Sequence, residues 1–369
     1  MRNPLHSLCP YFAMFPEEFV AKQVLAYSRR GDTVFDPFCG RGTTVLESLL
    51  QGRPSAGTDI NPVAACVAAA KAAPPQLGSV IARLHELQEI FVGGSTRLTP
   101  PHDFFFSACF HPKTLSHVLF LRERLNWQTS RVDRFIAAVT LGCLHGESHK
   151  SPNCLSNRMP RTISTKPDYS VRWWAAKRCF APERDAFVIL RRMCELRLSA
   201  ASLPLRGSVK MRDAREAARA FPRLRGRVKL IVTSPPYLDT TDYREDQWLR
   251  LWFLGGPAHP NPLVASDDRH TNSEAYWKFL TDTWSGCARL LASESVVVVR
   301  IGGTRLSKQE LFTGLRESLK SGLAGSLVRP LHHGTTTEIR NRQTNVFRPG
   351  TESKRYEHDF AFAVSRKHV

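Results

Sequence analysis

A proline-rich corner carries the first residues that suit catalysis. Residues 233–237, Thr-Ser-Pro-Pro-Tyr, follow an apolar run with the composition of a buried strand. The two prolines remove two backbone donors and fix two φ angles, so the chain leaves the strand along one rigid path. Ser234 offers hydrogen-bond acceptors and Tyr237 an aromatic ring. Rigid acceptors of this kind suit chemistry that depends on preorganised dipoles and near-attack geometry.

A glycine turn near the amino terminus indicates a nucleotide-like ligand. In residues 36–44, Asp-Pro-Phe-Cys-Gly-Arg-Gly-Thr-Thr, Gly40 and Gly42 let the backbone approach a ligand at the start of a helix. The dinucleotide fingerprint would have a third glycine where Val45 stands, so the pattern disfavours a nicotinamide cofactor. Asp59, seventeen residues beyond Gly42, ends the next predicted strand and is placed to accept hydrogen bonds from ribose hydroxyls.

Both motifs need a parallel sheet to bring them together. Residues 31–73 predict a strand at Val34 and Phe35, a helix over residues 43–51, a strand over residues 55–59 and an Ala-rich helix after it. This strand–helix alternation begins an α/β sheet. In such sheets ligands bind outside the carboxyl ends of the strands, where both motifs are expected.

The centre of the chain interrupts this alternation. Helices are predicted over residues 78–92, 114–127, 132–146 and 183–198, around an irregular basic loop at residues 147–174. Sheet-like segments return at residues 207–221, 226–237, 294–303, 324–333 and 358–366. A further helix is predicted over residues 308–319. The simplest organisation is one discontinuous α/β domain, residues 1–73 and 206–369, with a helical, basic insertion at residues 74–205.

The charge predicts a polyanionic partner. The chain of 369 residues has 52 Lys and Arg against 33 Asp and Glu, a formal net charge of +19. Residues 151–229 alone hold 19 Lys and Arg against 6 Asp and Glu, a net charge of +13. Such an excess favours nucleic acid, since concentrated cationic side chains neutralise phosphates.

Cysteine usage and the amino-terminal residues indicate the compartment. Nine cysteines occur without a C-x-x-C pair, which suggests neither a zinc site nor a disulfide framework, and reduced thiols are the expectation. The first residues lack the apolar core of a signal peptide, and no apolar run reaches membrane-spanning length. We therefore expect a cytoplasmic, nucleoid-associated protein.

Three segments in consistent order resemble one enzyme family. Residues 36–44 resemble motif I of the S-adenosylmethionine-dependent amino-methyltransferases of DNA, and residues 233–237 resemble their catalytic motif IV. Residues 11–20, Tyr-Phe-Ala-Met-Phe-Pro-Glu-Glu-Phe-Val, resemble motif X. The resemblance implies a doubly wound, mostly parallel, Rossmann-like sheet of the seven-stranded methyltransferase type. Serine in motif IV is typical of cytosine-N4 enzymes, and residues 74–205 match the family position of a target-recognition insertion.

The resemblance also assigns roles to residues. The Ser234 side chain and the Pro235 carbonyl would accept hydrogen bonds from the exocyclic amine of cytosine, held still by Pro236. Tyr237 would stack on the base after it is flipped from double-stranded DNA. No metal is required. The cofactor S-adenosylmethionine would be held by Phe15, Pro16, Asp36, Pro37, Phe38, Gly40, Gly42, Thr43, Asp59 and Asp213. The DNA would be contacted by Arg158, Arg161, Arg172, Trp173, Arg340, Arg342 and Arg348.

Several alternatives stay open from the sequence. Asp213 also suits the N-cap of a following helix, Trp173 suits packing, and residues 338–358 suit a solvated loop. The same motifs fit adenine-N6 methylation of DNA or amino-methylation of RNA. A basic DNA-binding protein with an inactive methyltransferase fold is the rival from another class. Recognition sequence, oligomeric state and the presence of a cognate restriction endonuclease are not fixed by the sequence.

Overall fold

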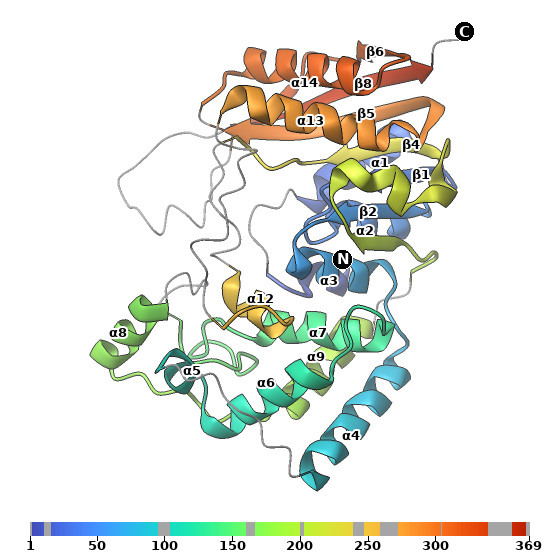
Figure 1. The fold of residues 1–369 in the computed structure, drawn as a ribbon. Coiled ribbons are helices and arrows are strands. Elements are labelled where there is room, and N and C mark those ends of the chain that lie inside the picture. The colour runs from blue at the N-terminus through green and yellow to red at the C-terminus, as the bar shows by residue number, and fades with distance from the viewer. Residues whose placement is uncertain are drawn as a thin grey trace. The chain divides into compact units, whose positions relative to one another are not determined.

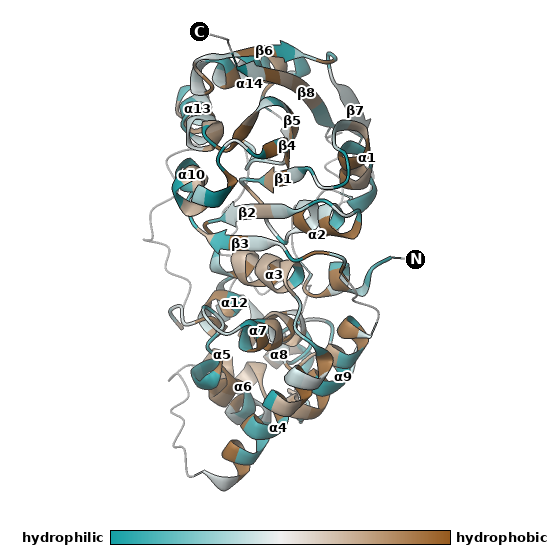
Figure 2. Cartoon of the chain, turned by 90° about the vertical axis from the view of Figure 1, so that its right-hand side faces the viewer, coloured by the Kyte–Doolittle hydropathy of each residue, from teal (hydrophilic) through white to brown (hydrophobic). Residues whose placement is uncertain are grey.

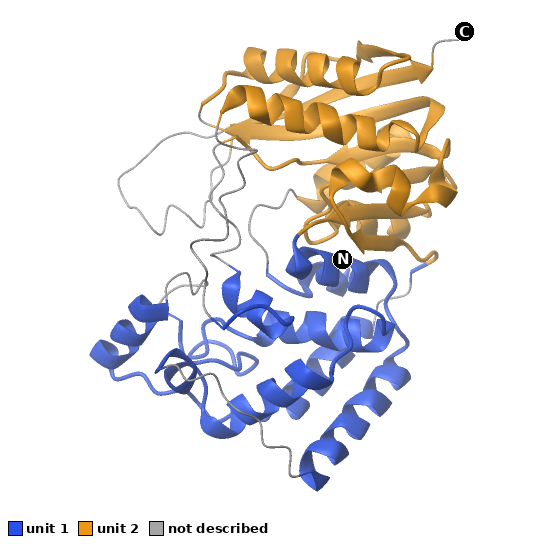
Figure 3. Cartoon of the chain, viewed as in Figure 1, with its two compact units in different colours: residues 1–14, 61–203, 242–264 blue, residues 15–60, 204–241, 265–369 orange. Residues whose placement is uncertain are grey.

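The computed structural model divides into two compact units. It describes residues 2–10, 16–94, 104–159, 167–199, 203–238, 247–258, 272–303, 305–338 and 356–366. Figure 3 shows the helical unit, residues 1–14, 61–203 and 242–264, in blue, and the sheet unit, residues 15–60, 204–241 and 265–369, in orange. The helical unit therefore takes in residues 61–73, which the sequence prediction grouped with the sheet.

The sheet unit holds an eight-stranded sheet. Its strands are β1 (Thr33–Asp36), β2 (Ser55–Asp59), β3 (Ser208–Met211), β4 (Val228–Thr233), β5 (Leu291–Gly303), β6 (Ser326–Pro330), β7 (Thr335–Glu338) and β8 (Tyr356–Arg366). Seven lie in the order β3-β2-β1-β4-β5-β8-β6, and β7 pairs with β8. Strands β1 to β5 pair in parallel, whereas β8 runs antiparallel to β5, β6 and β7. The predicted α/β, mostly parallel, Rossmann-like fold is confirmed.

Helices cover both faces of this sheet because successive apolar side chains of its central strands point to opposite faces, which makes both faces apolar. The side chains of Phe35 and Ile231 pack with α13 (Ser273–Ala288) and α14 (Lys308–Gly322). Their neighbours on the same strands, such as Val34, pack against α1 (Glu17–Tyr27) on the other face. The two sets of helices lie on opposite sides of the sheet in Figure 2. The remaining helices of this unit are α2 (Thr43–Leu50), η2 (Ala214–Glu216), α10 (Ala217–Ala220) and η3 (Pro222–Leu224).

The helical unit is built around aromatic side chains. Its helices are η1 (Pro4–Ser7) and, labelled in Figure 1, α3 (Pro62–Ala72), α4 (Leu77–Gly93), α5 (Phe104–Cys109), α6 (Pro112–Arg124), α7 (Arg131–Cys143), α8 (Pro167–Lys177), α9 (Ala186–Leu198) and α12 (Trp248–Phe253). Phe105 packs against Trp174 and Trp248 with ring centroids 5.6 and 4.8 Å apart. Buried Arg250 donates to the carbonyls of Pro10 and Leu141, which ties distant segments together.

The structure corrects the predicted elements in one segment and adds others. The basic loop predicted at residues 147–174 becomes helical at Pro167, where α8 begins with proline in its first turn. Helices α1, α5, α12 and α13 and strand β7 were not predicted from the sequence. Among the described residues, no helix combines the length and apolarity needed to cross a membrane.

Candidate active site

The two predicted motifs meet at the point where the strand order reverses. Strands β1 and β4 are parallel neighbours, with Phe35 opposite Ile231. Strands β2 and β3 continue the sheet beyond β1, and β5 continues it beyond β4. The sheet therefore extends in opposite directions from the β1–β4 pair, and a crevice is expected outside the carboxyl ends of these two strands. The Thr233 hydroxyl donates a 2.6 Å hydrogen bond to Oδ1 of Asp36. Residues 197 positions apart in the sequence are thus joined at the rim of the sheet.

The glycine loop after β1 adopts the conformation that only glycine accepts readily. Gly40 and Gly42 have φ of +48° and +79°, and Gly42 is the N-cap of α2. The Gly40 N–H donates to Oδ2 of Asp59 at 2.8 Å. The loop therefore places the start of a helix beside the carboxylate that ends β2, an arrangement suited to a ligand with a ribose. Thr43, another predicted cofactor residue, is the first residue of α2.

Close packing against β2 fixes the path of this loop. A Cβ at Gly57 would lie 2.6 Å from the carbonyl oxygen of Asp36 and 3.0 Å from Cβ of Cys39. The Thr58 hydroxyl donates to the Pro37 carbonyl at 2.8 Å, and the Cys39 N–H donates to the Thr58 carbonyl at 3.0 Å. Glycine at position 57 is required because the loop backbone occupies the space of a side chain.

The Asp36 carboxyl retains acceptor capacity in a fully buried position. Its Oδ1 accepts hydrogen bonds from the Thr233 hydroxyl and from the Phe38 N–H, at 3.0 Å for the latter. Its Oδ2 is buried and accepts no hydrogen bond from the described residues. Burial raises the pKa of this carboxyl to about 7, against the lowering effect of the hydrogen bond from Thr233. A cationic group of a ligand would relieve this cost, which fits the methionine part of S-adenosylmethionine.

The proline corner after β4 is held by side chains rather than by a second strand. The Ser234 hydroxyl, half-buried, donates to the Tyr237 hydroxyl at 3.5 Å. The Tyr237 hydroxyl donates to Oε1 of Glu357 at 2.9 Å. Pro235 is buried, and Phe38 and Tyr237 both pack against the same apolar core. The predicted catalytic residues and the glycine loop therefore belong to one rim of one sheet.

Glu357 is a residue that sequence reasoning missed. It lies in β8, opposite Gly302 of β5. Its contact with Tyr237 spans 120 positions of the sequence. The residues around Glu357 have the alternating polar and apolar pattern of an ordinary strand, so the local sequence does not mark this carboxylate as part of a site. Only the antiparallel register of β8 with β5 places it at the proline corner.

Asp213 adopts the alternative role that the sequence left open. Its carboxylate caps η2 by accepting from the Arg215 N–H at 2.9 Å. The Arg215 guanidinium also donates to both oxygens, at 3.0 and 2.8 Å. Capping and pairing account for this carboxylate structurally, and its predicted contact with the cofactor adenine stays a prediction.

The other predicted residues divide between the two units. Pro16 is the N-cap of α1 in the sheet unit. In the helical unit, the Arg158 guanidinium lies 5.5 Å from the Trp173 ring centroid, and both Arg158 and Arg172 are exposed. Exposed Arg158 and half-buried Trp173, with exposed Arg172 next to Trp173 in the sequence, form a cationic and aromatic group, which is suited to phosphates and bases. The remaining predicted residues lie outside the described part of the chain: Phe15, Arg161, Arg340, Arg342 and Arg348.

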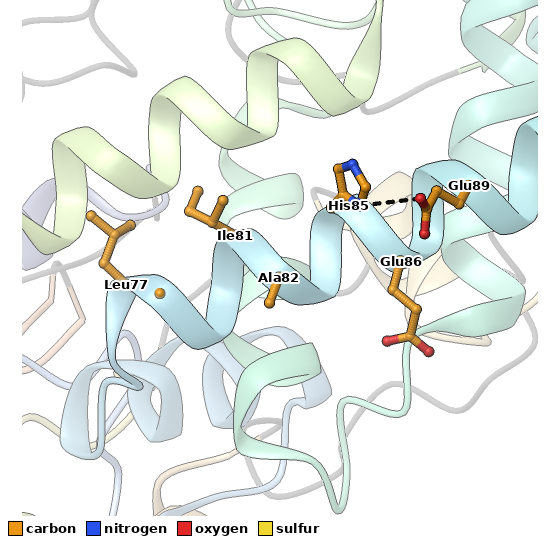
Figure 4. Close-up of a pocket in the computed structure, with 7 residues that line it drawn as sticks. Leu77, Ile81, Ala82, His85, Glu86 and Glu89 are labelled. Carbon is orange, nitrogen blue, oxygen red and sulfur yellow. Dashed lines mark ion pairs between the residues drawn. The ribbon is translucent and has the colours of Figure 1, made fainter.

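The surface pocket shown in Figure 4 is not part of this arrangement. It is lined by one face of α4, including Leu77, Ile81 and His85, and none of the predicted catalytic residues lines it. The dashed line in the same figure marks the ion pair of His85 with Glu89, and Nδ1 of His85 is 3.5 Å from Oε1 of Glu89. Within the described ranges, no three His, Cys, Asp or Glu side chains are grouped closely enough to hold a metal ion.

Comparison with known proteins points to one class of enzyme. A family model described as DNA methylase matches residues 2–70, the segment that contains the glycine loop. This match supports S-adenosylmethionine as the cofactor. The chain is 45% identical over 49 residues to the orphan methyltransferase M.BamHII of Bacillus amyloliquefaciens, a match that spans 13% of this chain and 18% of that protein.

Solved structures give weaker likenesses. The rRNA methyltransferase aviRa from Streptomyces viridochromogenes is 14% identical with a TM-score of 0.37, over 98% of this chain and 94% of that one. A SAM-dependent methyltransferase from Agrobacterium tumefaciens is 11% identical with a TM-score of 0.35, over 97% and 64% of the two chains. The α/β fold is defined by the strand order of the sheet, β3-β2-β1-β4-β5-β8-β6.

Proposed function

We propose that this chain transfers a methyl group from S-adenosylmethionine to the exocyclic N4 amine of cytosine in double-stranded DNA. The observation that carries the proposal is the junction of the two motifs, where the Thr233 hydroxyl is bonded to Asp36 at 2.6 Å. A loop suited to a nucleoside cofactor and a corner suited to an amine thereby share one rim of the sheet. The match of residues 2–70 to a DNA methylase model supports both the class and the cofactor.

The glycine loop supplies the cofactor site in this proposal. Asp59 would bind the ribose hydroxyls, and the buried acceptor of Asp36 would face the cationic methionine part. Pro37, Phe38 and Gly40 would line the pocket between them. When bound, the cofactor supplies an electrophilic methyl group on a sulfonium.

The proline corner activates the nucleophile. The exocyclic amine of cytosine is a poor nucleophile because its lone pair is delocalised into the ring. The Ser234 hydroxyl and the Pro235 carbonyl would accept hydrogen bonds from its two N–H groups, which favours a pyramidal nitrogen. Preorganised acceptors act without reorganisation cost in the transition state. The methyl transfer would form the N–C bond as the S–C bond of the donor breaks and its electron pair stays on sulfur, so the donor would leave as a neutral thioether. The extra proton on the nitrogen would pass to solvent, and no covalent bond to the protein forms.

The base must leave the duplex before it can reach this corner, since its amine is inaccessible within the stack. Tyr237 would contact the flipped base through its ring, whose hydroxyl is already held by Glu357. The serine form of motif IV supports cytosine rather than adenine. This preference comes from the resemblance of residues 233–237 to cytosine-N4 enzymes.

Exposed arginines support DNA as the substrate. The group formed by Arg158, Arg172 and Trp173 lies in the helical unit, where target recognition is proposed. The sheet unit adds a second basic segment, because residues 204–229 hold nine Lys and Arg against two acids. Its exposed arginines are Arg206, Arg212, Arg215, Arg219, Arg223, Arg225 and Arg227. Such surfaces bind phosphates with an affinity that falls steeply with salt.

A transfer assay tests the proposal. The protein would be incubated with cofactor labelled on the methyl group and with either duplex DNA or structured RNA. We expect label in DNA and none in RNA. Label in RNA alone would assign the activity to RNA amino-methylation. Failure to bind the cofactor by calorimetry would instead support a DNA-binding protein with an inactive fold.

A further inference from the structure

A chain of hydrogen bonds with one direction begins at the proposed catalytic serine. The Ser234 hydroxyl donates to the Tyr237 hydroxyl, and the Tyr237 hydroxyl donates to Glu357, at 3.5 and 2.9 Å. An ionised carboxylate can only accept hydrogen bonds, whereas a hydroxyl can both donate and accept. Glu357 therefore makes Tyr237 a donor toward itself, which leaves the Tyr237 oxygen as an acceptor for the hydrogen of Ser234.

Glu357 is not needed to neutralise the buried arginine beside it. The Arg300 guanidinium donates to both carboxylate oxygens of Asp359, at 2.6 and 2.8 Å. It also lies 3.8 Å from the ring centroid of Phe19. Its Nη1 is 3.6 Å from Oε2 of Glu357, a longer contact. Arg300 thus has a complete partner in Asp359, and the second carboxylate is available for the Tyr237 hydroxyl.

The backbone of β5 leaves room for the tyrosine at this place. A Cβ at Gly302 would lie 3.3 Å from Cε2 of Tyr237 and 2.5 Å from the carbonyl oxygen of Tyr356. Gly302 is also the register partner of Glu357. The same step of the β5–β8 ladder therefore admits the ring and presents the carboxylate that bonds its hydroxyl.

We infer that Glu357 is a positioning residue for methyl transfer, acting through Tyr237 to turn the hydrogen of the Ser234 hydroxyl away from the substrate amine. The inference depends on the proposed function of this site. With its hydrogen committed to Tyr237, Ser234 presents only lone pairs to the amine. A Ser234 hydrogen aimed at the amine nitrogen would compete for the lone pair that must attack the methyl group.

The ionisation states agree with this direction. Burial, followed by the negative charge of Glu357, raises the pKa of the Tyr237 phenol well above its ordinary value, so it remains a donor. Burial also raises the pKa of Glu357, although the charge of Arg300 opposes the shift and Asp359 adds to it. As pH falls through this raised pKa, Glu357 gains a proton and the fixed direction is lost. Activity should therefore fall toward acid pH earlier than an ordinary carboxylate would cause.

Four variants test the inference: Glu357→Gln, Glu357→Ala, Tyr237→Phe and the double variant Tyr237→Phe/Glu357→Ala. Glutamine keeps the shape of Glu357 but can donate as well as accept, so it removes the direction alone. We expect each single variant to lower kcat by about 10- to 100-fold, by analogy with the loss seen when the partners that orient metal ligands are removed, since those partners also act through a neighbouring group. The cofactor Kd should be unchanged, and the double variant should be no slower than the slower single variant, since both interrupt one chain.

The controls separate this inference from folding and from the proposed function. Glu294→Gln lies on the same strand pair, exposed and opposite Ser365, and should leave kcat and its pH profile unchanged. In Glu357→Gln the fall of kcat toward acid pH that Glu357 causes in the wild type should disappear. A folded Glu357→Ala variant with wild-type kcat, or independent multiplicative losses in the double variant, would overturn the inference. A wild-type protein that methylates no DNA would overturn the proposed function first.

Discussion

The two loops at the rim of the sheet are held in place by different means. The glycine loop after β1 is held by its near neighbour in the sequence, β2, where Gly57 leaves room for the loop and the Thr58 hydroxyl and Asp59 carboxylate hydrogen-bond to it. The proline corner after β4 is held by side chains from β5 and β8, through Glu357 and Arg300. The first loop is therefore a property of a short local segment, and the second depends on strands that form far along the chain. This difference separates cofactor binding from chemistry and makes each open to independent disruption.

The largest effect is expected from removing the proposed acceptor at the corner. Ser234→Ala should lower kcat by about 100- to 1000-fold, the loss typical of one preorganised group that acts on the transition state. Cofactor affinity should stay at the wild-type value, because the glycine loop is untouched. Steady-state transfer to DNA and calorimetry with the cofactor measure the two quantities. Ser273→Ala, at an exposed position in α13, is the matched control, and a Ser234→Ala variant with wild-type kcat would refute the separation of the two loops.

The converse disruption acts on the glycine loop. Gly57→Ala places a methyl group 2.6 Å from the Asp36 carbonyl oxygen, so the backbone must shift. Overpacking of this kind costs about 1–3 kcal/mol of unfolding free energy. We expect weaker cofactor binding as well, since Asp36 and Cys39 form the loop wall. Denaturant unfolding measures the loss, and Gly78→Ala in α4, where a Cβ meets nothing within 4 Å, should not destabilise the protein. Equal stability of the two variants would contradict the packing argument.

Cofactor binding should also depend on pH through Asp36. Its raised pKa, about 7, means that the free protein holds this carboxyl protonated below neutral pH. A cationic ligand favours the ionised form, so affinity should rise with pH until the carboxyl is ionised. Between pH 6 and pH 8 the expected gain is about tenfold, and binding should release protons. Calorimetry in buffers of different ionisation enthalpy measures this release, and Asp36→Asn should remove the dependence; a flat profile in the wild type would count against cofactor contact.

The smallest effect is expected at the hydrogen bond that joins the two loops. Thr233→Val removes the donor to Oδ1 of Asp36 and should cost about 1 kcal/mol of stability. Because this bond lowers the pKa of Asp36, its loss should move the pH dependence of cofactor binding toward higher pH. A shift in the opposite direction, or none, would show that the two loops are not coupled through this contact.

The same contrast explains what could be predicted from the sequence. Strands β1 and β2 and helix α2 follow from apolar runs and a glycine turn within about thirty residues, and the structure confirms them. Glu357 could not be predicted, because its position at the corner depends on the β5–β8 register. Helix α8 could not be predicted within its basic, proline-containing segment, because its buried residues are Ser170 and Trp174 and a serine adds nothing to an apolar pattern.

The most direct test of the central claim is the identity of the methylated nucleoside. Duplex DNA would be incubated with the protein and S-adenosylmethionine, digested to nucleosides and analysed by mass spectrometry. The account predicts N4-methyldeoxycytidine with the wild-type protein and its loss with Ser234→Ala. N6-methyldeoxyadenosine as the product, or no methylated nucleoside from a protein that binds the cofactor, would contradict it.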